Sequence, residues 1–228
     1  MSDPILEQGI GCLRKSDPAI AACLDRNTPR ILSLLNNYIE EIERFNPAYG
    51  LVGAKNRREL VVKHILDSLS PLGILWTLLK QHSSGLIGDV GSGAGLPGIP
   101  LAICLVDYSF VLIERMERRS RFLSNTLAVL RLPNAAVETV EMERASPGRF
   151  RLITFRAFKP LEPALLKALF RLLEPEGVLA AYKGRRDTIE AEMGNIEHLL
   201  GTWEAVPVKP PFLEEERHLV VMHNTALN

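Results

Sequence analysis

Four glycines lie within eight residues near the middle of the chain, at positions 91, 93, 95 and 98. They follow a strand-length segment, 86–90, that is mostly apolar, and apolar residues resume at Ile99. This pattern predicts a strand, a glycine turn and a helix. Glycine tolerates positive φ angles and lets a ligand approach the backbone closely. The turn is therefore a candidate site for a small molecule, although a purely structural turn with no ligand is the alternative.

Two acidic residues indicate which small molecule the turn would take. Gly93, Gly95 and Gly98 match the G-x-G-x-x-G pattern of dinucleotide sites, but Asp89 would tend to repel a pyrophosphate held at the start of the helix. S-adenosylmethionine carries an ammonium and a sulfonium, and an acid suits both cations. Glu114 ends the next apolar strand and is placed to accept hydrogen bonds from a ribose. Dinucleotides need this second acid too, so a nicotinamide-dependent oxidoreductase or a non-catalytic nucleotide-binding module remains an alternative.

The stretch GDVGSGAGLPGIPLAI, residues 88–103, resembles motif I of the glucose-inhibited division protein B family. Members of that family are bacterial methyltransferases that modify guanine N7 in small-subunit ribosomal RNA. With four further matches, this stretch keeps the family's order between about residue 28 and the end of the chain: 63–69 resembles R-H-x-x-D-S-L, 118–123 resembles K-R-x-x-F-L, 156–157 resembles R-A, and 216–221 resembles E-R-H-L-V-V. Five ordered matches are specific even though each alone is weak.

The resemblance implies S-adenosyl-L-methionine as cofactor and assigns residues to it. Asp89 would draw the ammonium group, directly or through water, and Glu114 would take the ribose. The adenine would lie after the third strand, where an ungapped count places the family arginine at Glu143 and a one-residue insertion places it at Arg144; we prefer Arg144. The expected cofactor-binding residues are Asp89, Gly91, Gly93, Gly95, Leu96, Glu114, Arg144, Ala145, Ser146 and Arg156.

The implied reaction is methyl transfer to guanine N7 of 16S ribosomal RNA, as naked RNA or in an assembling small subunit. Guanine N7 has an in-plane lone pair and no proton, so no general base is needed. Orientation of the reactants can supply roughly 7–11 kcal/mol. Instead of contacting RNA, His64 could equally form a buried hydrogen-bonded pair with Asp67, one helical turn away. Each cluster of basic residues could likewise be a solvated surface with no ligand. The expected substrate-positioning residues are Arg156, His64, Arg118, Arg119, Lys183 and Arg217.

Composition limits the function classes. The chain has 228 residues, of which 46% are hydrophobic, and its 27 basic residues balance its 27 acidic ones. A neutral protein has no global field for a polyanion, so any RNA surface must be a local patch. Neutrality also keeps a small-molecule or protein methyltransferase as an alternative. Three cysteines without a C-x-x-C pattern predict no metal site. The absence of a signal peptide or membrane span in this sequence leads us to expect a cytoplasmic protein, and we expect a monomer.

The elements that position these residues fall into two regions. Residues 1–85 are expected to form a helical region packed on the core: one helix from Thr28-Pro29 until Pro47, helices near 58–69 and 71–81, and short helices or partial disorder before residue 28. Residues 86–228 alternate strands and helices, which predicts a mostly parallel α/β sheet. The resemblance implies the class I methyltransferase fold, Rossmann-like, with seven strands and an antiparallel last strand. Strands are expected near 86–90, 109–114, 135–140, 150–155, 177–182, 202–208 and 217–223, and helices near 98–105, 118–131, 160–173 and 186–200.

Overall fold

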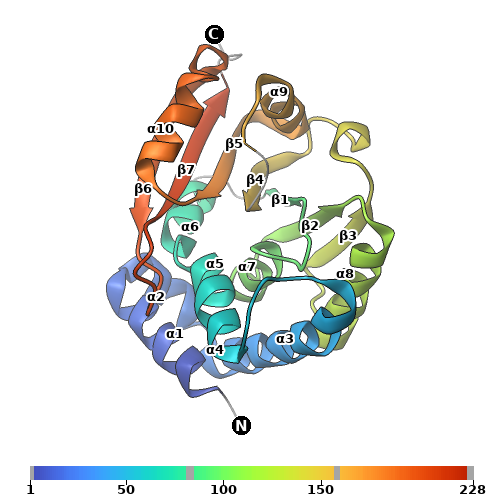
Figure 1. The fold of residues 1–228 in the computed structure, drawn as a ribbon, viewed down its shortest axis with the longest axis vertical. Helices are drawn as coiled ribbons and strands as arrows, with labels where there is room; N and C mark the ends of the chain where they lie inside the picture. The colour runs from blue at the N-terminus through green and yellow to red at the C-terminus, as the bar shows by residue number, and fades with distance from the viewer. Residues whose placement is uncertain (1–2, 81–84, 157–159, 225–228) are drawn as a thin grey trace.

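A computed structural model describes residues 3–80, 85–156 and 160–224 and contains one seven-stranded sheet (Figure 1). The strand order is β3-β2-β1-β4-β5-β7-β6, and only the pairs that include β7 are antiparallel. This confirms the predicted class I methyltransferase fold. The strands are β1 Leu86–Val90, β2 Ser109–Glu114, β3 Ala135–Thr139, β4 Phe150–Arg156, β5 Leu173–Lys183, β6 Leu200–Val208 and β7 Arg217–Asn224.

The centre of the sheet is the point where the strand order reverses. The chain moves from β1 to β2 and β3 on one side, and from β4 to β5 on the other. Asp89 of β1 lies in register with Leu112 of β2 and with Thr154 of β4. Ligands of open α/β sheets bind beyond the carboxyl ends of strands at such a reversal. The ends of β1 and β4 therefore define where a site is expected.

Helices cover both faces of the sheet. Figure 1 shows the N-terminal helices gathered along one end of the molecule, with α3 running toward α8. In the first region the helices are α1 Pro4–Ser16, α2 Pro18–Leu24, α3 Thr28–Tyr49, α4 Arg57–Leu60, the π-helical segment η1 Val61–Leu66, α5 Asp67–Leu69 and α6 Leu72–Lys80. In the second they are α7 Gly98–Cys104, α8 Glu117–Leu130, α9 Pro163–Leu172 and α10 Arg186–Gly194, with 3-10 turns at Met142–Arg144 (η2) and Glu197–Leu199 (η3).

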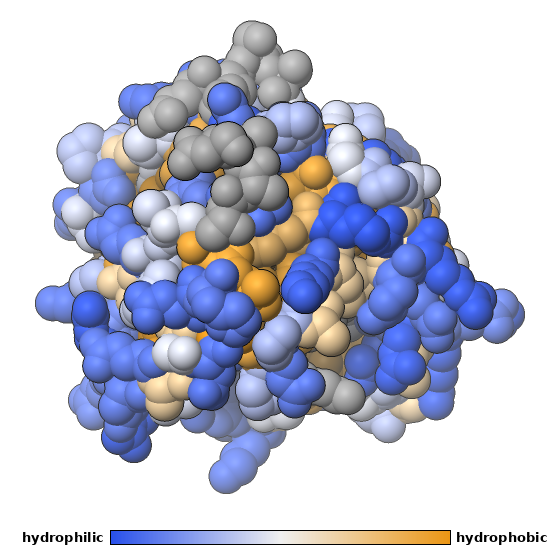
Figure 2. Space-filling view, turned by 90° about the horizontal axis from the view of Figure 1, so that it is seen from above, coloured by the Kyte–Doolittle hydropathy of each residue, from blue (hydrophilic) through white to orange (hydrophobic). Residues whose placement is uncertain are grey.

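The hydrophobic core is divided between two clusters, one on each face of the sheet. The larger contains buried residues from both sequence regions, among them Leu6 and Tyr38 from the N-terminal helices and Leu101 and Phe122 from α7 and α8. The second includes Leu169 of α9 and other residues on β4, β5 and α10. Figure 2 shows one outer face, where hydrophilic side chains surround a central group of hydrophobic ones. Among the helices described, none is long and apolar enough to cross a membrane.

The N-terminal segment is more regular than its sequence pattern indicates. Helices α1 and α2 occupy Pro4–Ser16 and Pro18–Leu24, so this part of the chain forms short helices, one of the two alternatives that the sequence left open. The side chain of Asp3 accepts hydrogen bonds from the backbone of Ile5 (2.9 Å) and Leu6 (3.1 Å), and Asp17 accepts one from Ala19 (2.7 Å). Each aspartate precedes a proline at the first helical position, so both are N-caps of the usual kind.

The expectation that Pro47 ends the long helix is wrong. Helix α3 continues to Tyr49, and Gly50 ends it with φ of 59° while its N–H donates to the Asn46 carbonyl over 2.9 Å. A proline in the last turn removes only one hydrogen bond, and the left-handed glycine supplies the stop. At the other end Asn27, and not Thr28, is the N-cap.

Two boundaries in the second half also differ from the prediction. Strand β5 begins at Leu173 instead of 177, because Leu173 pairs with Phe150 ahead of an irregularity in β5, after which Val178 pairs with Leu152. The helix expected over 186–200 ends at Gly194 and is followed by η3, after which β6 starts at Leu200.

Candidate functional site

The glycine turn between β1 and α7 has an open position and a packed position. Gly91, Gly93 and Gly95 have φ of 71°, 57° and 92°. A Cβ on Gly93 would meet only the Gly91 carbonyl oxygen, at 3.8 Å, whereas a Cβ on Gly95 would come within 2.5 Å of the Ile99 side chain. Gly93 therefore faces open space that a ligand can use, and Gly95 is required for packing.

Asp89 is built into the base of this turn. Its side chain is fully buried, and Oδ2 accepts a hydrogen bond from the Gly98 N–H over 3.1 Å. A Cβ on Gly98 would lie 2.6 Å from the same oxygen. Oδ1 has no hydrogen-bond partner among the described residues. Burial raises the pKa of Asp89 to about 7, opposed by the hydrogen bond from the Gly98 N–H, while the Ser92 hydroxyl donates to the Asp89 backbone carbonyl over 2.8 Å. An unpaired buried acceptor is costly, so Oδ1 is suited to a donor from a ligand or from water.

Glu114 lies at the end of β2 and holds the turn from the other side. Its Oε2 accepts from the Gly93 N–H (3.0 Å) and its Oε1 from the Met116 N–H (2.8 Å). Each carboxylate oxygen has a second lone pair. The Val140 N–H donates to the Glu114 carbonyl over 3.2 Å, which brings the segment after β3 against this residue. A nucleoside bound at the turn would therefore reach both Glu114 and that segment.

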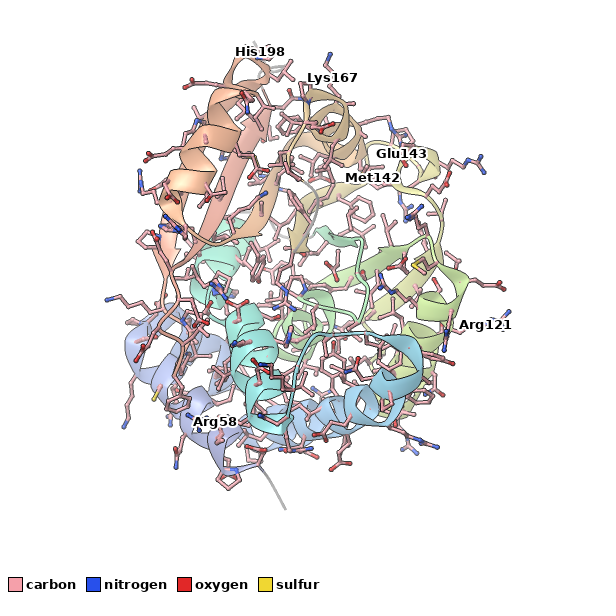
Figure 3. All side chains as sticks on the ribbon, in the orientation of Figure 1. Arg58, Arg121, Met142, Glu143, Lys167 and His198 are labelled. Atoms are coloured by element: carbon pink, nitrogen blue, oxygen red, sulfur yellow. The ribbon has the colours of Figure 1, made fainter. Side chains whose placement is uncertain are left out.

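The segment after β3 presents backbone more than side chains. The Arg144 side chain is exposed and pairs with Glu141 at 3.4 Å, Ala145 is buried and Ser146 is exposed. Arg171 of α9 donates to the carbonyls of Met142 (3.0 Å) and Ala145 (2.8 Å) and so fixes the turn. Figure 3 shows Met142 and Glu143 on this turn, beside α9. Leu96, in the glycine turn itself, is buried.

Arg156, the last residue of β4, is held by three residues of the preceding helices. Its Nη1 donates to Asp67 Oδ2 (3.1 Å) and to the Lys63 carbonyl (3.3 Å), and its Nη2 to His64 Nδ1 (3.0 Å). The other oxygen of Asp67 lies 3.4 Å from Nε of Arg217. His64 and Asp67 are thus joined through Arg156, an arrangement that the sequence alternatives did not include.

Four of the predicted substrate-positioning residues meet around one cavity of about 240 Å³. Its lining includes His64, Arg156, Lys183 and Arg217, from η1, β4, β5 and β7. Arg118 and Arg119 are not among its lining residues. The Arg118 guanidinium instead stacks 4.3 Å above the Tyr49 ring and donates to the Ala48 carbonyl. Figure 3 shows Arg121 of the same helix at the opposite side of the molecule from Arg58.

The electrostatics of this cluster fix the state of His64. Burial, and then the Arg156 guanidinium, lower the pKa of His64 to about 4. A guanidinium only donates hydrogen bonds, so Nδ1 is the acceptor and Nε2 carries the proton. Burial raises the pKa of Asp67, while Arg156 and Arg217 oppose that shift. At neutral pH the cluster therefore contains a neutral imidazole and hydrogen-bonded guanidinium groups.

Sequence reasoning missed three residues that organise the two halves of the site. Asp67 connects Arg156 with Arg217, Arg171 fixes the turn after β3, and the Tyr38 hydroxyl donates to the Ala94 carbonyl in the glycine turn over 2.7 Å. Asp67 was named in the sequence only within a family-like motif and as a possible buried partner of His64, without a link to Arg156 or Arg217, and the other two carry no local signal. In residues 3–80, 85–156 and 160–224 there is no group of three or more His, Cys, Asp or Glu that could hold a metal ion.

The chain shares its fold with solved methyltransferase structures. One is a SAM-dependent methyltransferase from Aquifex aeolicus, with a TM-score of 0.53 and 18% identity over 69% of this chain and 91% of that chain. Another is a tRNA methyltransferase from the same organism, with a TM-score of 0.53 and 16% identity over 68% of each chain. At these identities the likeness establishes the fold.

Closer similarity is found at the level of sequence. The curated Ribosomal RNA small subunit methyltransferase G of Treponema pallidum is 40% identical over 202 residues, which cover 87% of each chain. The protein of the same name from Nitrosococcus oceani is 35% identical over 216 residues, 93% of this chain and 94% of the relative. A family model described as rRNA small subunit methyltransferase G matches residues 31–220. This chain therefore belongs to the rRNA small subunit methyltransferase G family.

Proposed function

We propose that the protein transfers the methyl group of S-adenosylmethionine to N7 of a guanine in 16S ribosomal RNA. The observation that carries this proposal is that two sites lie next to each other at one edge of the sheet. The first is the glycine turn with Asp89 and Glu114, and the second is the cluster around Arg156. The names of the relatives support ribosomal RNA of the small subunit as the substrate.

The residues of the glycine turn fit the proposed cofactor. S-adenosylmethionine supplies an electrophilic methyl group on a sulfonium sulfur. Gly93 leaves open space for it, Oδ1 of Asp89 is an acceptor with no partner in the described part of the chain, and Glu114 retains lone pairs for ribose hydroxyls. Oδ1 can therefore take the ammonium or an intervening water. Ala145 and Ser146 follow shortly after Val140, whose N–H donates to the Glu114 carbonyl, so their backbone groups are placed to meet the adenine. Charge supports this choice over a dinucleotide, because a nearby cation favours the ionised form of Asp89, whose pKa is raised by burial, whereas a pyrophosphate at the turn would disfavour it.

The acceptor cluster is suited to a guanine that needs no deprotonation. A donor placed on N7 would block the lone pair that attacks the methyl group, so recognition must use other atoms, such as O6. His64 presents Nε2–H and Arg156 an ordered guanidinium, and both are donors without basic character at neutral pH. Orientation by these groups can contribute about 7–11 kcal/mol to lowering the barrier.

The test is methyl transfer in vitro. The purified protein is incubated with 16S ribosomal RNA lacking the modification and with S-adenosylmethionine labelled in its methyl group. Label should enter the RNA and be recovered as 7-methylguanine after digestion. Protein and small-molecule extracts, offered in parallel, should remain unlabelled. If label enters the protein or the small-molecule extract and none enters RNA, the proposed substrate class is wrong.

A further inference from the structure

Phe212 is an exposed aromatic residue in an unfavourable backbone conformation. It lies in the turn between β6 and β7, where the Leu213 N–H donates to the Pro210 carbonyl over 3.3 Å. Its φ is +65°, and 45% of its surface is exposed. Glycine or asparagine normally occupies a positive-φ position of such a turn. A large apolar side chain held there at a conformational cost points to a use of that side chain on the surface.

The Phe212 ring lines a groove that leads to the proposed acceptor site. The groove has a volume of about 630 Å³ and is formed by the β6–β7 turn on one side and by α4 and η1 with the preceding loop on the other. Lys63 lines both this groove and the smaller cavity that contains Arg156. Arg58, a residue of α4 that is labelled in Figure 3, also lines this groove. A nucleotide next to the target base would therefore meet this groove first.

The charges of the groove favour a base over a phosphate. Lys55, Arg58 and Lys63 are matched by Glu59, Glu214 and Glu215, so the lining has no net charge. Lys63 is itself paired with Glu59 (2.8 Å) and lies 3.8 Å from Glu215. A phosphate would gain little from such a lining. The edge of a base offers both donors and acceptors, and its face can stack on an aromatic ring.

We propose that Phe212 is a stacking platform for one unpaired base of the RNA substrate, adjacent to the base that is methylated. This inference rests on the proposed function, because it names a contact of the same substrate. Proteins that bind single-stranded RNA stack unpaired bases on aromatic side chains, and this contact is independent of those to the phosphates. The Phe212 position thereby extends the substrate site beyond the cavity at Arg156.

The backbone strain makes the test selective. Phe212→Gly relieves the positive φ, so its melting temperature should equal or exceed that of the parent. The same variant cannot stack on a base, so its KM for 16S ribosomal RNA should rise by roughly 5- to 100-fold, the range of one stacking interaction. Affinity for S-adenosylmethionine should be unchanged. Phe212→Tyr keeps the ring and should retain a KM within about twofold of the parent.

A second measurement does not depend on catalysis. In Phe212→Trp, a short single-stranded RNA of mixed sequence should quench the fluorescence of the new indole. The quenching should exceed that of the parent, whose fluorescence comes from Trp76 and Trp203. If RNA quenches the fluorescence of Phe212→Trp but the parent does not methylate 16S ribosomal RNA, the stacking site is supported and the proposed reaction is refuted. An unchanged KM in Phe212→Gly, or no added quenching, would overturn the inference while the methylation stands. A KM that rises only for assembled subunits, and not for naked RNA, would overturn it in favour of a protein contact.

Discussion

The turn glycines at positions 93 and 95 have similar backbone angles but different surroundings. Both have positive φ, yet only Gly95 is packed against Ile99 and Leu123. A side chain added at either position costs backbone strain. Only at Gly93 would it enter the space that we assign to the cofactor. The two positions therefore separate binding from stability.

Gly93→Val should abolish binding of S-adenosylmethionine and reduce the melting temperature only modestly. Gly95→Ala should lower the melting temperature more, because its Cβ overlaps Ile99. Calorimetric titration and thermal denaturation of both variants provide the test. If Gly93→Val folds normally and binds with parental affinity, the glycine turn does not contact the cofactor.

His64 makes the stability of the protein depend on pH. Its pKa is lowered from 6.5 in the unfolded chain to about 4 in the fold, so between these values the unfolded state binds more protons. The contribution of His64 to the free energy of unfolding therefore falls as pH decreases from about 6.5 to 4. His64→Gln does not titrate, and it should lack this part of the decrease. Urea denaturation at several pH values measures it, and parallel curves for parent and variant would refute the neutral, buried imidazole.

A buried hydrogen bond links helix α3 to the glycine turn. The Tyr38 hydroxyl is fully buried and donates to the Ala94 carbonyl. Removing it leaves that carbonyl without this donor. Tyr38→Phe should lose about 1–3 kcal/mol of unfolding free energy and weaken S-adenosylmethionine binding. Denaturation and titration are the measurements, with Tyr108→Phe, in the loop before β2, as control. A parental affinity in Tyr38→Phe would show that α3 does not position the turn.

The elements that sequence patterns predicted are those with local signals. The alternation of strand-like and helix-like apolar segments predicted all seven strands, and the glycine spacing predicted the turn after β1. The π-helical segment Val61–Leu66 has no separate periodicity in the sequence, yet it contains Lys63 and His64. The bonds from Arg156 to His64 and Asp67 span about 90 residues, so only the folded chain reveals them. Arg171 and Tyr38 likewise act through backbone carbonyls of distant turns, for which sequence carries no signature.

The whole molecule has no net charge, so its attraction for RNA must be local. The groove beside Phe212 is balanced in charge, and Lys183 is paired with Glu192 at 2.7 and 2.9 Å. Arg118 of α8 packs against Tyr49 and Ala48 at the end of α3, where the loop toward the groove begins. We propose that Arg118 and Arg119 at the start of α8 supply phosphate contacts.

The pair Arg118→Ala and Arg119→Ala, made together, should lower RNA affinity and flatten its salt dependence. Each phosphate that the variant no longer neutralises reduces the slope of log affinity against log salt by about 0.7 for a single strand. S-adenosylmethionine affinity should not change. RNA binding measured across a salt series gives both slopes. Equal slopes for parent and variant would exclude the start of α8 from the RNA surface.

The central claim is that the two neighbouring sites at the edge of the sheet methylate guanine N7 in 16S ribosomal RNA. The most direct measurement is mass mapping of 16S ribosomal RNA from a strain that lacks this gene, complemented with the parent, with Gly93→Val or with Arg156→Ala. The parent should restore one 7-methylguanine. Gly93→Val should not, and Arg156→Ala should restore far less although its cofactor affinity stays within a few-fold of the parent. A 16S ribosomal RNA with identical modifications in the deletion strain and the complemented strain would contradict the account.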